Sequence, residues 1–174
     1  MIGTGLVLWT VKRRRDQDKR LKAGQSVTFG FHLVEILNIA TLAGLFTAVA
    51  AYFWANRLLP LDLPRRAQWE ADAMFIVWGL LLGLVALRLR FAPSLCVWAE
   101  QFWLAAAAFG LLPLLNALTT DRHLGVTLPA GDWVLEGFDL TVLGLAAVFG
   151  FIAWKLRRKG ALNAVAAQGR EAVA

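Results

Sequence analysis

Four apolar blocks, each long enough to cross a lipid bilayer, constrain the fold of this chain more than any other feature of its sequence. A helix needs roughly 17 to 25 mostly apolar residues to span a hydrocarbon core about 30 Å thick. The blocks lie near Val27–Trp54, Ala71–Leu87, Leu95–Leu118 and Trp133–Leu156. Because backbone groups inside lipid must be hydrogen-bonded within their own segment, such blocks predict helices. We therefore expect an all-α polytopic transmembrane helix bundle, with four full spanning helices over residues 27–156.

A fifth apolar block, residues 1–11, is about half the length needed to span a bilayer. It runs directly into the basic residues 12–15, which is the reverse of the order in a signal peptide. The pattern predicts the end of a partial transmembrane helix, followed by a basic cytoplasmic loop over residues 12–26. We expect an earlier N-terminal portion, another membrane subunit or self-association to complete the bundle.

The distribution of Lys and Arg predicts the orientation of the helices, because positive residues in short loops are retained on the cytoplasmic side. Of the 18 basic residues, 14 fall on one side of the predicted membrane and four on the other. This places the C-terminus on the cytoplasmic side of the membrane, with a tail over residues 157–174 that is either a weakly ordered helix or disordered. The net charge of +6 is then explained by juxtamembrane clusters beside lipid headgroups, without a nucleic-acid partner. The 14 residues are Lys12, Arg13, Arg14, Arg15, Lys19, Arg20, Lys22, Arg88, Arg90, Lys155, Arg157, Arg158, Lys159 and Arg170.

Polar residues recur along the first spanning block at spacings of three or four, which places them on one slowly drifting helix face. They are Thr28, His32, Glu35, Asn38 and Thr41. One interpretation makes His32 a haem ligand or proton relay that is held or supplied with protons by Glu35. The other is an interhelical hydrogen-bond network that fixes packing.

A six-coordinate b-type haem usually needs two axial ligands. The second histidine, His123, lies in the loop at the opposite side of the membrane from His32, so the two cannot share one haem within a single copy. A second ligand must come from outside the chain or from another residue type. Glu100, near the inner end of the third spanning block, is a candidate relay that could contact His32 or Glu35.

Glu136 and Asp139 open the fourth block three residues apart, where they can share a helix face and relay protons or bind a cation. Their attraction to the helix dipole is the alternative explanation. The single cysteine, Cys96, can form neither an internal disulfide nor a cysteine-pair metal site. No phosphate-binding loop, HExxH or CxxC motif is present, so neither a self-contained hydrolase nor an ATP-driven transporter is predicted.

Three features predict how the helices pack. Gly79 and Gly83 form a GxxxG pair, which allows close helix approach. Pro113 should kink the third spanning helix and free the carbonyl of Phe109. Trp54, near a predicted helix end, is expected to anchor at the membrane surface with its indole N–H toward water.

Several segments resemble the C-terminal transmembrane portion of the PepSY-associated transmembrane family, whose members are described as iron-regulated membrane proteins. The likeness covers nearly the whole chain. The segments that carry it are Thr4–Trp9 with the basic run Lys12–Arg15, Leu33–Glu35 with Asn38, Ala40–Thr41 and Gly44, Tyr52–Pro60, Leu112–His123 and Gly131–Trp133.

The resemblance implies an inner-membrane bundle linked to iron or siderophore uptake, in which some members bind b-type haem and reduce ferric siderophores. This chain lacks the earlier helices and periplasmic segments of longer members, so only His32 and His123 are candidate ligands. Two hypotheses follow. One is a component of a ferric-siderophore reductase that carries electrons across the membrane, and the other is a noncatalytic scaffold or regulatory subunit of an envelope or iron-uptake complex.

Overall fold

The computed structural model describes Gly5, Lys12, Arg13 and residues 29–119 and 133–171. All regular structure in this part of the chain is helical, and four segments are long and apolar enough to cross a membrane. The predicted all-α bundle with four spanning helices is thus confirmed, and the chain is a multi-pass membrane protein. The partial helix over residues 1–11 lies outside the described residues, apart from Gly5. The four segments are Phe29–Leu58, Arg66–Arg88, Ser94–Thr119 and Gly137–Asn163.

The first spanning segment consists of α2 (Phe29–Ile39), a π-helical turn η1 (Ala40–Gly44) and α3 (Leu45–Leu58). A π-turn holds one more residue than an α-turn, so it rotates the side chains that follow it relative to those before it. The polar stripe predicted along this segment is interrupted here, because Asn38 is buried and Thr41 is exposed. Thr28 lies outside the described residues.

The third spanning segment is divided at Leu111 into α5 (Ser94–Gly110) and α6 (Leu112–Thr119). Pro113 is the second residue of α6, a position in the first helical turn where its missing N–H costs no helical hydrogen bond. The kink predicted near Pro113 is therefore present as a break at Leu111, between α5 and α6.

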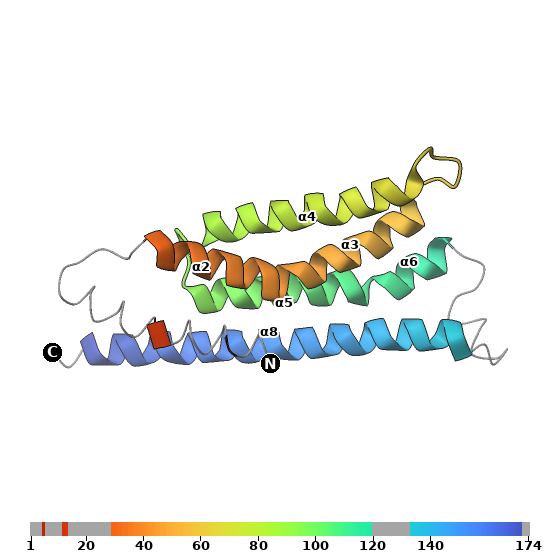
Figure 1. Cartoon of the computed structure of the whole chain (residues 1–174). Coiled ribbons are helices and arrows are strands. Elements are labelled where there is room, and N and C mark those ends of the chain that lie inside the picture. The colour runs from red at the N-terminus through yellow and green to blue at the C-terminus, as the bar shows by residue number, and fades with distance from the viewer. Residues whose placement is uncertain (1–4, 6–11, 14–28, 120–132, 172–174) are drawn as a thin grey trace.

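The helices lie roughly along one axis, as Figure 1 shows. Central α2 and α3 lie between α4 (Arg66–Arg88) on one side and α5 with α6 on the other. Beyond α5 runs α8 (Trp133–Glu171), which packs extensively against α5. The C-terminal tail belongs to α8, which is continuous as far as Glu171. We call the end where α4 finishes and α5 begins the basic end, because Arg88, Arg90, Lys155, Arg157, Arg158 and Lys159 are placed there.

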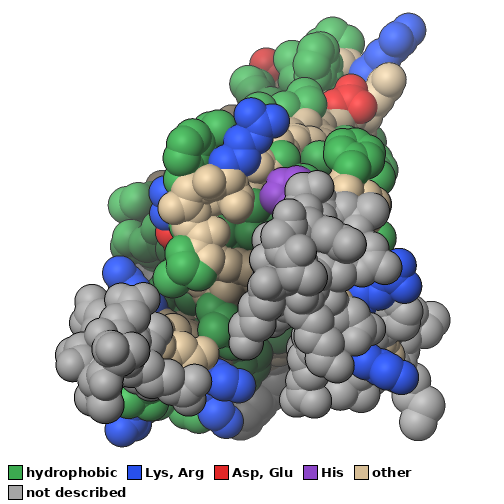
Figure 2. Space-filling view, turned by 90° about the vertical axis from the view of Figure 1, so that its left-hand side faces the viewer, with side chains coloured by type: hydrophobic (Ala, Val, Ile, Leu, Met, Phe, Trp, Pro, Cys, Tyr) green, Lys and Arg blue, Asp and Glu red, His purple; other side chains and the backbone are tan. Residues whose placement is uncertain are grey.

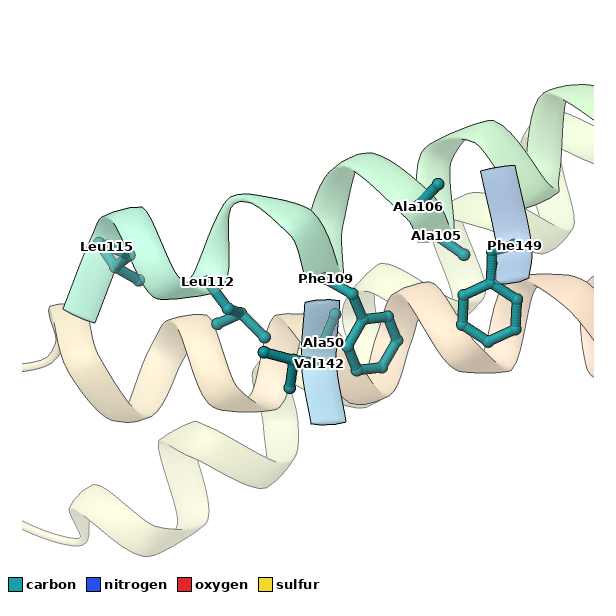
Figure 3. Packing of buried hydrophobic residues seen from close by; sticks show 8 residues of the cluster. All are labelled: Ala50, Ala105, Ala106, Phe109, Leu112, Leu115, Val142 and Phe149. Carbon is teal, nitrogen blue, oxygen red and sulfur yellow. The ribbon is translucent and has the colours of Figure 1, made fainter. Parts of the chain in front are cut away.

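The larger apolar core joins α3, α5, α6 and α8 (Figure 3). Alanines at Ala50, Ala105 and Ala106 leave space beside the rings of Phe109 and Phe149. Phe149 is 5% exposed and its ring centroid lies 5.8 Å from that of Phe109. Two further rings surround it, with centroids 4.8 Å away at Phe46 and 6.0 Å away at Phe102.

Small residues do bring helices together, but between α5 and α8. A Cβ added to Gly110 would lie 3.5 Å from the Cβ of Ala146. By contrast, Gly79 and Gly83 of the predicted GxxxG pair are exposed, and a Cβ on either would meet no atom within 4 Å. The expectation that this pair packs two of the described helices is wrong, because it faces the outside of the bundle.

The outer surface of the bundle is largely apolar, as expected for helices whose solvent is lipid. Exposed side chains include Phe75 and Leu80 on α4 and Val148 and Phe151 on α8. Figure 2, which views the molecule from the basic end, shows Lys and Arg side chains distributed around this apolar surface.

Trp54 does not keep its indole N–H toward water, as the sequence suggested. It is half-buried, and its Nε1 donates a hydrogen bond of 2.9 Å to the carbonyl of Ala108. This bond ties α3 to α5 one turn before the break at Leu111.

Candidate functional site

The strongest sequence candidates, His32 and Glu35, lie on α2 near the basic end. His32 is half-buried, while Glu35 and Asn38 are each only 7% exposed. Positions three apart on a helix are neighbours on its surface, so the backbone places His32 and Glu35 on adjoining positions of one face. A buried carboxyl group in an apolar helix is unusual enough to mark a site worth testing.

His32 is the one histidine among the described residues, because His123 lies outside them. No group of three or more His, Cys, Asp or Glu side chains in the described part of the chain could hold a metal ion. A b-type haem would therefore find at most one histidine ligand, His32, in these helices. Its second axial ligand would have to be supplied from elsewhere, as the sequence suggested.

Glu100 pairs with an arginine. Its Oε2 accepts a 2.9 Å hydrogen bond from Nε of Arg88, and its Oε1 forms an ion pair with Nη2 of the same residue. This bidentate pair links the last turn of α4 to α5 at the basic end. The carboxylate of Glu100 is thus paired with Arg88, and the hypothesised contact with His32 or Glu35 stays a prediction.

The π-turn creates a polar region in mid-bundle that sequence patterns did not reveal. The indole Nε1 of Trp78, on α4, donates a 3.1 Å hydrogen bond to the carbonyl of Ala40, the first residue of the turn. On the other side, Gln101 of α5 is 1% exposed, and a Cβ on Gly44 would lie 3.5 Å from its Oε1. Trp78 therefore links α4 to the irregular backbone of the first spanning segment through a hydrogen bond.

Oε1 of Gln101, beside the π-turn, and Oγ1 of Thr47 on α3 are buried polar atoms with no hydrogen-bond partner among the described residues. Leaving a buried polar atom without a partner costs about 1–3 kcal/mol. A water molecule or the polar group of a ligand would remove that cost, and π-turns occur often at functional sites. No sequence pattern identifies a π-turn, although a glutamine inside an apolar helix is a usable signal.

At the opposite end of the bundle, Asp139 lies where a relay was predicted, but its partner is an amide. Nδ2 of Asn116 donates a 2.8 Å hydrogen bond to Oδ1 of Asp139, and both residues are buried. Glu136 belongs to the backbone of α8, but its side chain lies outside the described part. The proposed sharing of a cation or proton by Glu136 and Asp139 therefore stays a prediction.

A second polar group at that end joins α3 to α4. Glu70 is 5% exposed and its Oε1 lies 3.1 Å from Nε of Arg66, one helical turn earlier. The same oxygen accepts a hydrogen bond of 3.1 Å from Nδ2 of Asn56. Arg66 also donates to the carbonyl of Asn56, which completes a three-residue network.

No protein-family model, curated protein or solved structure matches this chain. The resemblance to the PepSY-associated family therefore rests on the sequence motifs alone.

Proposed function

We propose that this chain is a bacterial inner-membrane protein linked to iron or siderophore uptake, and that it contributes to electron transfer across the membrane. The observation that carries the proposal is the location of His32, a half-buried histidine one helical turn from the buried carboxyl group of Glu35. A second polar group commonly orients a ligating histidine by accepting its other N–H. The sequence likeness to iron-regulated membrane proteins supplies the substrate class.

In this proposal, His32 provides one axial ligand of a b-type haem, and another segment or chain provides the second. A bound haem would supply one-electron chemistry at a potential set by its ligands and surroundings. The described residues would hold the group on one side: His32 would ligate it and Glu35 would orient the imidazole. The four apolar segments would keep water away from that site.

The decisive experiment is a reduced-minus-oxidised visible spectrum of the detergent-purified chain, alone and coexpressed with the product of its neighbouring gene. We expect a b-type haem signal in at least the coexpressed sample, and we expect His32→Ala to abolish it. Glu35→Gln should retain haem and shift its midpoint potential, because the carboxylate is replaced by a neutral group. A haem spectrum and ferric reductase activity that survive His32→Ala would reject His32 as the ligand.

A noncatalytic scaffold is the second candidate, and it is favoured by a specific observation. Two polar pairs, Asn116 with Asp139 and Arg88 with Glu100, hydrogen-bond directly between helices. Such pairs fix helix packing and need no ligand or substrate. Absence of haem from both purified samples, together with poor assembly of the neighbouring gene product in a deletion strain, would favour the scaffold.

A further inference from the structure

A cavity at the basic end is lined by both charged and apolar side chains, and neither candidate function involves a ligand in it. Its volume is 590 Å³, and it is bounded by α4, α5 and α8. It exists because α4 packs mainly on α3, whereas α5 packs mainly on α8. At this end α4 and α5 are therefore bridged by side chains, chiefly by the Arg88–Glu100 pair.

Three charged side chains line the cavity: Arg88, Glu100 and Arg157. Two guanidinium groups and one carboxylate leave one positive charge. Glu100 accepts from Nε and Nη2 of Arg88, so Nη1 of Arg88 is directed away from this carboxylate and remains able to donate elsewhere. Both side chains of the pair are about 40% exposed, so a ligand can reach them. Arg157 is exposed on the facing helix.

The rest of the lining is apolar and lies deeper in the membrane. Trp103 and Leu104 follow Glu100 by three and four residues on α5, which places them about 4.5–6 Å further from the basic end. Leu84 lies one turn before Arg88 on α4, at the same side of the cavity. These three side chains are 39–44% exposed, so they form an apolar strip that continues from the cavity to the outside of the bundle.

A single positive charge above an apolar strip matches an anionic amphiphile better than a soluble ion. Arginine binds phosphate through paired N–H donors, and basic pockets between transmembrane helices on the cytoplasmic side bind anionic lipid headgroups. We propose that this cavity binds the phosphate of a monoanionic phospholipid. The phosphate contacts Arg157 and Arg88, and one acyl chain lies along Leu84, Trp103 and Leu104. Glu100 positions Arg88 and limits the site to one negative charge.

Native mass spectrometry of the full chain in neutral detergent tests this, using phosphatidylglycerol and phosphatidylcholine with identical acyl chains. We expect one phosphatidylglycerol to be retained in preference to phosphatidylcholine, and Arg157→Gln to weaken that binding about five-fold. Arg158→Gln is the matched control, because Arg158 is the next residue, lies 5.6 Å from the ring centroid of Trp154 and does not line the cavity. Equal losses in both variants, or no loss in Arg157→Gln, would overturn the site.

Inorganic phosphate in large excess separates a lipid from a free anion. If the acyl chain contributes as proposed, phosphate does not displace phosphatidylglycerol, and Trp103→Ala weakens lipid retention. Displacement by phosphate together with an unchanged Trp103→Ala variant would show a soluble-anion site and reject the lipid. Circular dichroism of each variant verifies that the helices are intact.

Discussion

The side chain of Asn116 donates a 2.8 Å hydrogen bond to Asp139, and this buried bond joins α6 to α8. Oδ1 of Asn116 has no partner among the described residues, so the amide is held by this one bond on its donor side. The two residues are 23 positions apart in sequence, and the chain between them includes residues outside the described part. The pair therefore fixes how α6 and α8 lie against each other, which the segment between them would not determine by itself.

We predict that Asp139→Ala destabilises the bundle by about 0.6–2 kcal/mol, because it leaves the Asn116 amide without an acceptor inside an apolar layer. SDS-induced unfolding of the purified chain measures this change. Leu140→Ala is the control, since Leu140 is 61% exposed on the same helix. An Asn116→Ala, Asp139→Ala double variant that loses the full sum of the two single losses would contradict direct coupling.

Phe149 and Phe151 offer a matched pair on α8. Phe149 is 5% exposed among three other rings, whereas Phe151 is 59% exposed. Phe149→Ala should lower the free energy of unfolding by roughly 2–4 kcal/mol, because it opens a cavity inside the core. Phe151→Ala should change it little, since lipid can fill the space. Equal effects in the unfolding titration would mean that Phe149 is not at the centre of packing.

Replacement by leucine should lower the stability of the protein at Gly44 but not at Gly79. A Cβ at Gly44 would already contact Gln101 and Leu81 at 3.5 and 3.6 Å, whereas one at Gly79 would meet nothing within 4 Å. Gly44→Leu therefore overpacks the region beside the π-turn and should cost about 1–3 kcal/mol. Gly79→Leu should leave the unfolding transition unchanged. A loss of stability in Gly79→Leu would indicate that another chain packs on α4.

Gln101→Leu tests whether the buried amide has an unobserved partner. If Oε1 is unsatisfied, as it is within the described residues, replacing the amide by an apolar side chain of similar size should stabilise the protein by about 1 kcal/mol. Gln68→Leu, at an exposed position of α4, is the control. A marked destabilisation by Gln101→Leu would show that a partner of the amide, at Oε1 or at Nε2, stabilises the protein by more than the unpaired oxygen costs.

The spanning segments could be predicted from sequence because hydropathy reports burial in lipid directly. The helix break was predictable as well, since Pro113 cannot donate within a helix. Which face each helix turns inward could not be predicted. Gly79 and Gly83 carry a packing motif yet face outward, while Gly110 approaches Ala146 without belonging to such a motif.

The candidate site was predictable only in part, because hydropathy locates buried segments but not the rotation of each helix about its axis. Burial of Glu35 follows from its place in an apolar block, and the polar stripe located it. The bridge between Arg88 and Glu100 depends on the rotation of two helices about their axes, which hydropathy does not encode. The π-turn at Ala40–Gly44 likewise depends on contacts with α4 and α5, because its own residues also suit an α-helix.

The 39 residues of α8 form a rod about 58 Å long, nearly twice the thickness of a hydrocarbon core. Its earlier turns pack against α5, and its last turns extend beyond the basic residues Lys155, Arg157, Arg158 and Lys159. A small tilt at the held portion is converted into a much larger sideways displacement at Glu171. The C-terminal end of α8 is thus a lever arm, whose position is set by the packing of its earlier turns against α5.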